Sequence, residues 1–197
     1  MNYKSKNYVK YTHPNSIFQY AISVFFREFY SLFTLTDANS VLEVGCGEGF
    51  VLDYLAKRNI DLKFYGIDVN YSALNTAQNI SAPIIDYVCA DGFQIPYADN
   101  TFDVVLLPEI IEHVSDPEKI LLESIRVSSF YILVTVPREP YFQKIADFFV
   151  KWNLADDPDH IQFWTSRELK KWLNSYVRIV SYETCHFYQL ALCEKIL

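Results

Sequence analysis

Three closely spaced glycines are the first residues whose spacing suggests chemistry. Residues 41–49 read VLEVGCGEG, an apolar run followed by a GxGxG pattern, with Glu43 before the glycines and Glu48 among them. Glycines permit backbone angles closed to other residues and bring helix-start amides close to a ligand. The dinucleotide pattern GxGxxG is absent, because Phe50 stands where its last glycine would be. Two carboxylates disfavour a pyrophosphate and suit a ligand with ammonium and sulfonium groups.

Two aspartates end the next two apolar runs. Asp68 closes the first of these in YGIDVN, where a carboxylate can accept hydrogen bonds from both hydroxyls of a ribose. Asp91, in CADGF, is placed to accept from the exocyclic amine of a base, with Val69 or Phe93 beside the ring. Aspartate is common in turns after strands, so each residue alone is weak evidence. Three acids at the ends of three successive strands, together with GxGxG after the first of these strands, indicate a nucleoside-containing ligand.

A second polar cluster follows the fourth predicted strand. In PEIIEHV, residues 108–114, Glu109, Glu112 and His113 stand at i, i+3 and i+4, which predicts one helical face bearing all three. His160 lies in a predicted loop after the fifth strand, over the same end of the sheet. Oxygen and nitrogen donors grouped in this way can bind Mg2+, Mn2+ or Zn2+. Two alternatives stay open: a metal-free general base, His113 or His160, or a pair that only shapes the pocket.

The elements that must position these groups alternate along the chain. Apolar β-rich runs predict strands, and the stretches between them predict helices. The predicted strands are 41–44, 63–69, 84–90, 102–107, 130–136, 177–184 and 187–194, and the predicted helices include 50–58, 72–79 and 117–127. This order predicts an α/β fold with a doubly wound, mostly parallel seven-stranded sheet and an antiparallel C-terminal hairpin at its edge.

The predicted domain organisation is a loose tail, residues 1–13, followed by a single domain, residues 14–197. Residues 14–36 predict a helix that either packs beside the domain or caps the substrate pocket. Residues 137–163 form a substrate-side insertion, whose aromatic side chains either enclose the acceptor or pack an amphipathic helix. The residues expected on that helix are Phe142, Ile145, Phe149 and Trp152.

Composition narrows the function classes. The 197 residues carry 17 Lys and Arg against 24 Asp and Glu, a net charge of −7 that disfavours a protein coating nucleic acid. The sequence predicts a cytoplasmic protein without a membrane span, because no uncharged apolar run is long enough and the cysteines form no disulfide framework. Two arginines near the predicted pocket, Arg138 and Arg167, either pair with an anionic substrate group or only solvate the surface.

Together these motifs resemble the class I S-adenosylmethionine (SAM)-dependent methyltransferases, of the type 11 kind that includes ubiquinone-type O-methyltransferases. VLEVGCGEG, GIDVN, CADGFQIPYADNTFDVV and EIIEHVSDPEKIL match the family's motifs in order. The usual LKPGG turn reads RVSSFYI here, which affects only a structural turn. The resemblance implies SAM as cofactor. The implied cofactor-binding residues are Glu43, Gly45, Cys46, Gly47 and Gly49 around the methionine, Asp68 and Val69 at the ribose, and Asp91, Gly92 and Phe93 at the adenine.

Two metal-dependent groups resemble the EIIEHV segment in particular. They are ubiquinone-type O-methyltransferases and small-RNA 3′-terminal 2′-O-methyltransferases, which act on neighbouring hydroxyls. The implied metal ligands are Glu109, Glu112, His113 and His160. The RNA enzymes are matched further by Trp164, Thr165, Leu169 and Trp172.

The sequence therefore predicts an enzyme that transfers a methyl group from SAM to a hydroxyl oxygen of a small molecule, with or without a divalent metal. One alternative is an RNA 3′-terminal 2′-O-methyltransferase, which the net charge of −7 weakens. Another is a non-catalytic SAM-binding subunit. The GxGxG spacing disfavours an NAD-dependent oxidoreductase. The expected partner is a hydroxylated small molecule, or an RNA terminus in the alternative, and the expected state is a monomer or homodimer.

Overall fold

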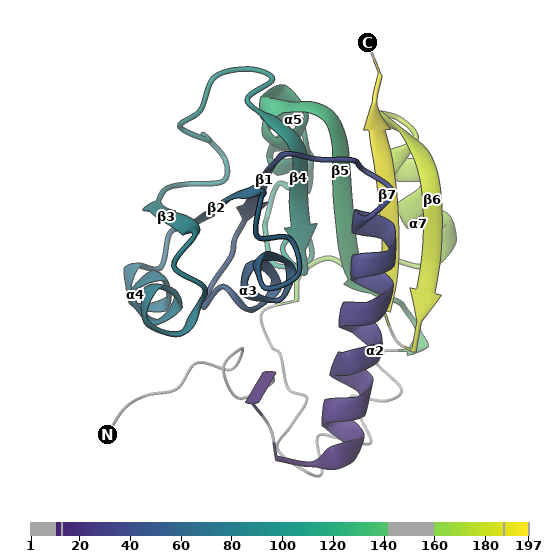
Figure 1. Cartoon of the computed structure of the whole chain (residues 1–197). Helices are drawn as coiled ribbons and strands as arrows, with labels where there is room; N and C mark the ends of the chain where they lie inside the picture. The colour runs from purple at the N-terminus through teal and green to yellow at the C-terminus, as the bar shows by residue number, and fades with distance from the viewer. Residues whose placement is uncertain (1–10, 13, 142–159, 187, 197) are drawn as a thin grey trace.

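The strands in the computed structural model, which describes residues 11–12, 14–141, 160–186 and 188–196, form one sheet (Figure 1). The order across it is β3-β2-β1-β4-β5-β7-β6. The strands are β1 Ser40–Val44, β2 Lys63–Asp68, β3 Ile85–Cys89, β4 Phe102–Pro108, β5 Ser128–Pro137, β6 Val177–Cys185 and β7 Tyr188–Lys195. β7 runs antiparallel to both of its neighbours, whereas β1 to β5 pair in parallel. The predicted fold class is confirmed; of the two hairpin strands, β7 lies inside the sheet and β6 is an edge strand.

The carboxyl ends of the parallel strands lie along one edge of the sheet, the lower edge in Figure 1. We call this the carboxyl edge. The turn between β6 and β7 also lies there, because Cys185 pairs with Tyr188, which pairs in turn with Pro137 at the end of β5. Segments from the first and last thirds of the chain therefore meet at one edge, where ligands bind in open α/β sheets.

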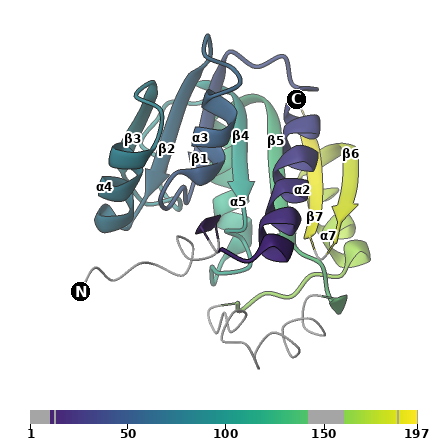
Figure 2. The same ribbon diagram turned by 60° about the horizontal axis from the view of Figure 1, so that its bottom comes forward.

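Helices cover both faces of the sheet. They are α2 Ser16–Phe33, α3 Phe50–Ala56, α4 Tyr71–Ile80, α5 Pro117–Val127 and α7 Ser166–Leu173. The first three lie on one face and the last two on the other (Figure 2). Phe25 and Phe29 of α2 are fully buried against this sheet, and each such burial contributes roughly 1.5–3 kcal/mol.

Polar caps start three of the helices. Asn70 accepts backbone hydrogen bonds at the start of α4, and Asp116 does so at the start of α5, one residue before Pro117. Thr165 and Glu168 form a capping box at the start of α7. These caps satisfy amide groups that the first helical turn leaves without partners.

Parts of two predicted segments lie outside the described residues. They are most of the tail, residues 1–13, and residues 142–159 of the insertion, with Phe142, Ile145, Phe149 and Trp152. The helix predicted within residues 14–36 is α2, which packs against β6, β7 and α3. Its role as a substrate cap stays a prediction. In the described part of the chain, no helix has both the length and the apolar character of a membrane span.

Candidate functional site

The glycine loop after β1 has a backbone that only glycine adopts easily. Gly45, Gly47 and Gly49 have φ angles of 71°, 51° and 75°. A Cβ on Gly45 would also lie 2.2 Å from Ile110 Cδ1, and one on Gly49 would lie 2.2 Å from the Tyr87 hydroxyl. The loop therefore requires glycine both for its dihedral angles and for the space around it.

Asp68 holds this loop at the end of β2. Its Oδ2 accepts a hydrogen bond from the Gly47 N–H at 2.8 Å, and its Oδ1 accepts from the Asn70 N–H at 2.7 Å. The carboxylate is half-buried. A carboxylate oxygen has lone pairs for more than one donor, so Asp68 can accept from ligand hydroxyls as well as from the loop.

Glu43 and Glu48 are almost completely buried beside the same loop. Burial raises the pKa of Glu43 well above its ordinary value, the Leu52 N–H opposes this, and the charge of Asp68 adds to it. Among the described residues, no group donates a hydrogen bond to Glu43 Oε2. A buried acid with a raised pKa is typical of functional sites, because its strain is relieved only by a ligand or a proton.

Asp91, the acid predicted after the third strand, lies at the β3 end of the carboxyl edge. Asp91 follows β3, is exposed, and accepts a hydrogen bond from the Phe93 N–H at 2.9 Å. Val69 is 69% exposed after β2, and Phe93 is half-buried. The structure thus brings the predicted cofactor-binding residues to the carboxyl edge, with a buried acidic end at Glu43 and an open, partly apolar end at Asp91.

The segment after β4 differs from the prediction. Residues 109–113 form turns, and Glu109 has a left-handed φ of 52°, so the predicted helical face is wrong. The i, i+3 and i+4 spacing of these residues does not reflect a helix, because α5 begins only at Pro117. Glu109 instead accepts a hydrogen bond from Tyr188, whose phenol pKa is raised far above its usual value by burial first and then by the Glu109 charge.

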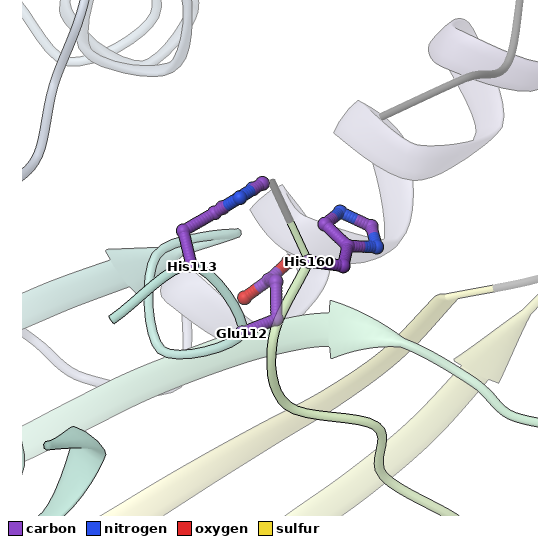
Figure 3. A group of neighbouring side chains, drawn as sticks. All are labelled: Glu112, His113 and His160. Atoms are coloured by element: carbon purple, nitrogen blue, oxygen red, sulfur yellow. The ribbon is translucent and has the colours of Figure 1, made fainter. Parts of the chain in front are cut away.

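Glu112, His113 and His160 nevertheless form a group, which we call the Glu-His-His cluster (Figure 3). Each offers a ligand atom, and these atoms lie within 4.8 Å of one another. The rings of His113 and His160 lie 4.6 Å apart between centroids. Glu112 is 1% exposed, and its carbonyl oxygen accepts the backbone N–H groups of Ile161 and Gln162 at 2.9 and 3.0 Å. Those two hydrogen bonds hold His160 beside the turn at residues 109–113, although the two segments are far apart in the sequence.

The sequence reasoning missed Tyr188. It is 6% exposed, begins β7, and its ring packs 5.0 Å from the ring of Phe25 in α2. The available signal was topological, since a last antiparallel strand starts at the edge where the parallel strands end. Glu109, expected to be a metal ligand, thus lies with Tyr188 and is not part of the Glu-His-His cluster.

Comparisons with known proteins agree with this geometry. Residues 42–129 match the family model described as a methyltransferase domain. Norajmaline N-methyltransferase of Rauvolfia serpentina is 35% identical over 95 residues, which cover 46% of this chain and 32% of that enzyme. The chain therefore spans about a third of the length of the first curated relatives it matches.

The ubiquinone biosynthesis O-methyltransferase of Coxiella burnetii matches a longer part of the chain. It is 27% identical over 161 residues, which cover 76% of this chain and 68% of that enzyme. The fold is shared with the PH0226 protein of Pyrococcus horikoshii, with a TM-score of 0.73 and 15% identity over 98% of this chain and all of that one. In the matched domain, the curated relatives and the shared fold, the chain is therefore similar to the class I SAM-dependent methyltransferases.

Proposed function

We propose that this chain transfers the methyl group of SAM to a hydroxyl oxygen of a small molecule, assisted by a divalent cation at the Glu-His-His cluster. The observation that carries the proposal is the position of that cluster, which follows β4 directly beside the glycine loop. Gly45 and Ile110 already approach each other closely. The cofactor and the groups that would act on an acceptor are therefore neighbours.

The proposed cofactor site runs along the carboxyl edge. The acidic, buried end at Glu43 suits the positively charged methionine portion, and Asp68 suits the ribose diol. Val69 and Phe93 offer apolar surface beside the adenine, with Asp91 next to them. Residues proposed to contact SAM are Glu43, Gly45, Cys46, Gly47, Gly49, Asp68, Val69, Asp91, Gly92 and Phe93.

The donor set fits a transition metal better than Mg2+. Two imidazoles and one carboxylate are ligands that suit Zn2+ or Mn2+, whereas Mg2+ prefers an all-oxygen shell with several waters. Their atoms lie within 4.8 Å of one another, close enough for the three side chains to reach one ion. When bound, the cation would lower the pKa of the acceptor hydroxyl.

Residues of the chain itself would position the acceptor and accept its proton. Glu112 is buried and would hold the cluster in place, while His113 and His160 are half-exposed and can contact an acceptor. If no cation is bound, either imidazole can take the hydroxyl proton, a contribution of typically 10²–10⁴ in rate. Because the sulfonium is an excellent leaving group, alignment of donor and acceptor supplies most of the acceleration.

The RNA-terminal alternative gains no support from the residues that suggested it. Thr165 caps α7, Leu169 is fully buried in the core, and the rings of Trp164 and Trp172 lie 4.9 Å apart. Capping accounts for Thr165, and packing accounts for Leu169 and for the contact between the two tryptophan rings. The experiment below therefore also tests an RNA acceptor and a non-catalytic SAM-binding subunit.

Calorimetry with S-adenosylhomocysteine (SAH), with and without Mn2+, tests the proposal. We expect SAH to bind the wild type, and Asp68→Ala to weaken it by about 1–3 kcal/mol through the loss of hydrogen bonds to hydroxyls. Methyl transfer from labelled SAM to catechol, to an aromatic amine and to a short RNA follows. No SAH binding would end the SAM proposal, transfer only to the amine or the RNA would end the small-molecule hydroxyl version, and SAH binding without any transfer favours the non-catalytic subunit.

A further inference from the structure

Arg138 follows β5 directly, at the carboxyl edge where the proposed site lies. Its guanidinium lies over the ring of Tyr141, 4.3 Å from the centroid. One Nη donates to the His186 carbonyl oxygen at 3.3 Å, a long hydrogen bond. These contacts hold the plane of the guanidinium and use only one of its five N–H donors.

The remaining donors of Arg138 lack the partners that this chain supplies to another arginine. Arg126 donates to Glu123, to Asp99 and to two carbonyl oxygens. By contrast, the Nε of Arg138 is buried without a hydrogen-bond partner, and no carboxylate pairs with Arg138, in the part of the chain that the structure describes. A buried cationic donor without an acceptor is unfavourable, so this position calls for a ligand acceptor.

A second buried donor lies in the same neighbourhood. The Nε1 of Trp164 also has no hydrogen-bond partner among the described residues. Its carbonyl oxygen accepts the N–H of Glu139, the neighbour of Arg138, at 3.1 Å, and the side-chain amide of Gln189 at 2.8 Å. Gln189 accepts in turn from the Tyr182 hydroxyl at 2.5 Å.

The charge of Arg138 reaches this same group of residues. Burial raises the pKa of Tyr182, and Arg138 is among the groups that oppose the rise. Arg138 and Trp164 therefore flank one network at the end of β5. The other arginine that the sequence singled out, Arg167, is exposed on α7 and takes no part in this network.

We propose that Arg138, with the Trp164 N–H, binds an oxyanion group of the methyl acceptor, a carboxylate or a phosphate. This inference rests on the proposed function and names its substrate class, a hydroxylated molecule that carries an anionic group. A planar guanidinium fits both oxyanions through paired N–H donors. Trp164 is four residues from His160, so at most about 14 Å of chain separates the two, and one small molecule can reach both.

Binding of simple probes to the full chain tests the assignment without knowledge of the acceptor. Benzoate, phenyl phosphate and the uncharged benzyl alcohol are titrated calorimetrically into the protein, with and without saturating SAH. We expect at least one of the two anions to bind about tenfold more tightly than benzyl alcohol, the effect of one charge-assisted contact. The two anions distinguish a carboxylate-bearing acceptor from a phosphorylated one.

Three arginine variants give the assignment its controls. Arg138→Gln removes the preference for the anions, Arg138→Lys keeps part of it because charge remains without the planar fork, and Arg167→Gln leaves it unchanged. Trp164→Phe reduces it by a smaller factor than Arg138→Gln. Thermal unfolding of each variant confirms that it folds.

Two results would overturn the assignment: equal binding of all three probes by the wild type, or an anion preference that survives in Arg138→Gln. Failure of the SAM proposal is read separately from the SAH titration. The anion titration without SAH still reports on Arg138 in that case.

Discussion

The two halves of the carboxyl edge are built differently. The half proposed to bind the cofactor takes its groups from short, successive connections, and its glycine loop is held to the adjacent strand by backbone hydrogen bonds from Gly45 and Cys46 to Ile67. The half proposed to bind the acceptor is assembled from a turn after β4, a segment from residue 160 onward, and the β6–β7 turn. A site built from neighbours in sequence can be read from a motif, whereas one built from distant segments requires the fold.

This difference suggests a division of labour. Rigid elements suit a cofactor that is the same for every member of a family, and loops suit an acceptor that varies among them. Variants in the first half should therefore change SAH affinity, and variants in the second half should leave it intact.

The largest effect is expected from Gly45→Val. A non-glycine residue at φ 71° is strained, and its side chain meets Ile110, so SAH should bind at least ~100-fold more weakly. Calorimetry measures the loss. Adding Ile110→Ala should restore only part of the affinity, because the backbone strain remains. Wild-type affinity in Gly45→Val would show that the loop does not contact the cofactor.

The matching variant in the acceptor half is Glu112→Gln. It keeps the shape of the buried side chain but removes a charged ligand, so Mn2+ affinity should fall by roughly 10–100-fold. SAH affinity should stay within about twofold, because Glu112 is not among the residues proposed to contact the cofactor. Glu118→Gln, exposed on α5, is the control for charge alone. A large loss of SAH binding in Glu112→Gln would break the division.

The sequence patterns located the residues of the proposed cofactor half better than those of the proposed acceptor half. The glycine loop, Asp68 and Asp91 were predicted because each lies directly after a strand whose apolar pattern is clear. The helical face of Glu109, Glu112 and His113 was wrong, because a left-handed residue begins the turn and no sequence pattern marks it.

Long-range contacts explain the other omissions. Tyr188 pairs with Glu109 from a strand far along the chain, and the lack of partners around Arg138 depends on what packs beside it. Neither is a property of local sequence. The metal ligands and cofactor contacts stay predictions.

Glu43 provides a pH test of the cofactor half. Its raised pKa means that the fold favours the protonated form, so this group lowers stability as the pH rises from about 5 through its raised pKa. Glu43→Gln should therefore raise the unfolding temperature near pH 8 and change it little near pH 4.5, while weakening SAH binding. A stabilisation equal at both pH values would mean that the carboxyl titrates normally.

The smallest predicted effect concerns the N-terminal cap of α7, the helix that follows the segment with His160. Thr165→Ala removes the capping box of α7, which should lower stability by about 1 kcal/mol and the unfolding temperature by roughly 2–4 °C. Scanning calorimetry measures both. Thr34→Ala, at an exposed position after α2, should change little. An equal loss in both variants would show that the cap is not what holds α7.

If the cation site adjoins the methyl end of the bound cofactor, a bound Mn2+ ion relaxes the S-methyl protons more than the adenine protons. Mn2+ is added to the full chain with bound SAM, and proton relaxation is compared between the S-methyl group and the adenine ring. We expect clearly stronger enhancement at the methyl protons, and its loss in Glu112→Gln. Equal or greater enhancement at the adenine protons, or enhancement that survives in Glu112→Gln, would show that the cation does not bind at the Glu-His-His cluster beside the methyl group.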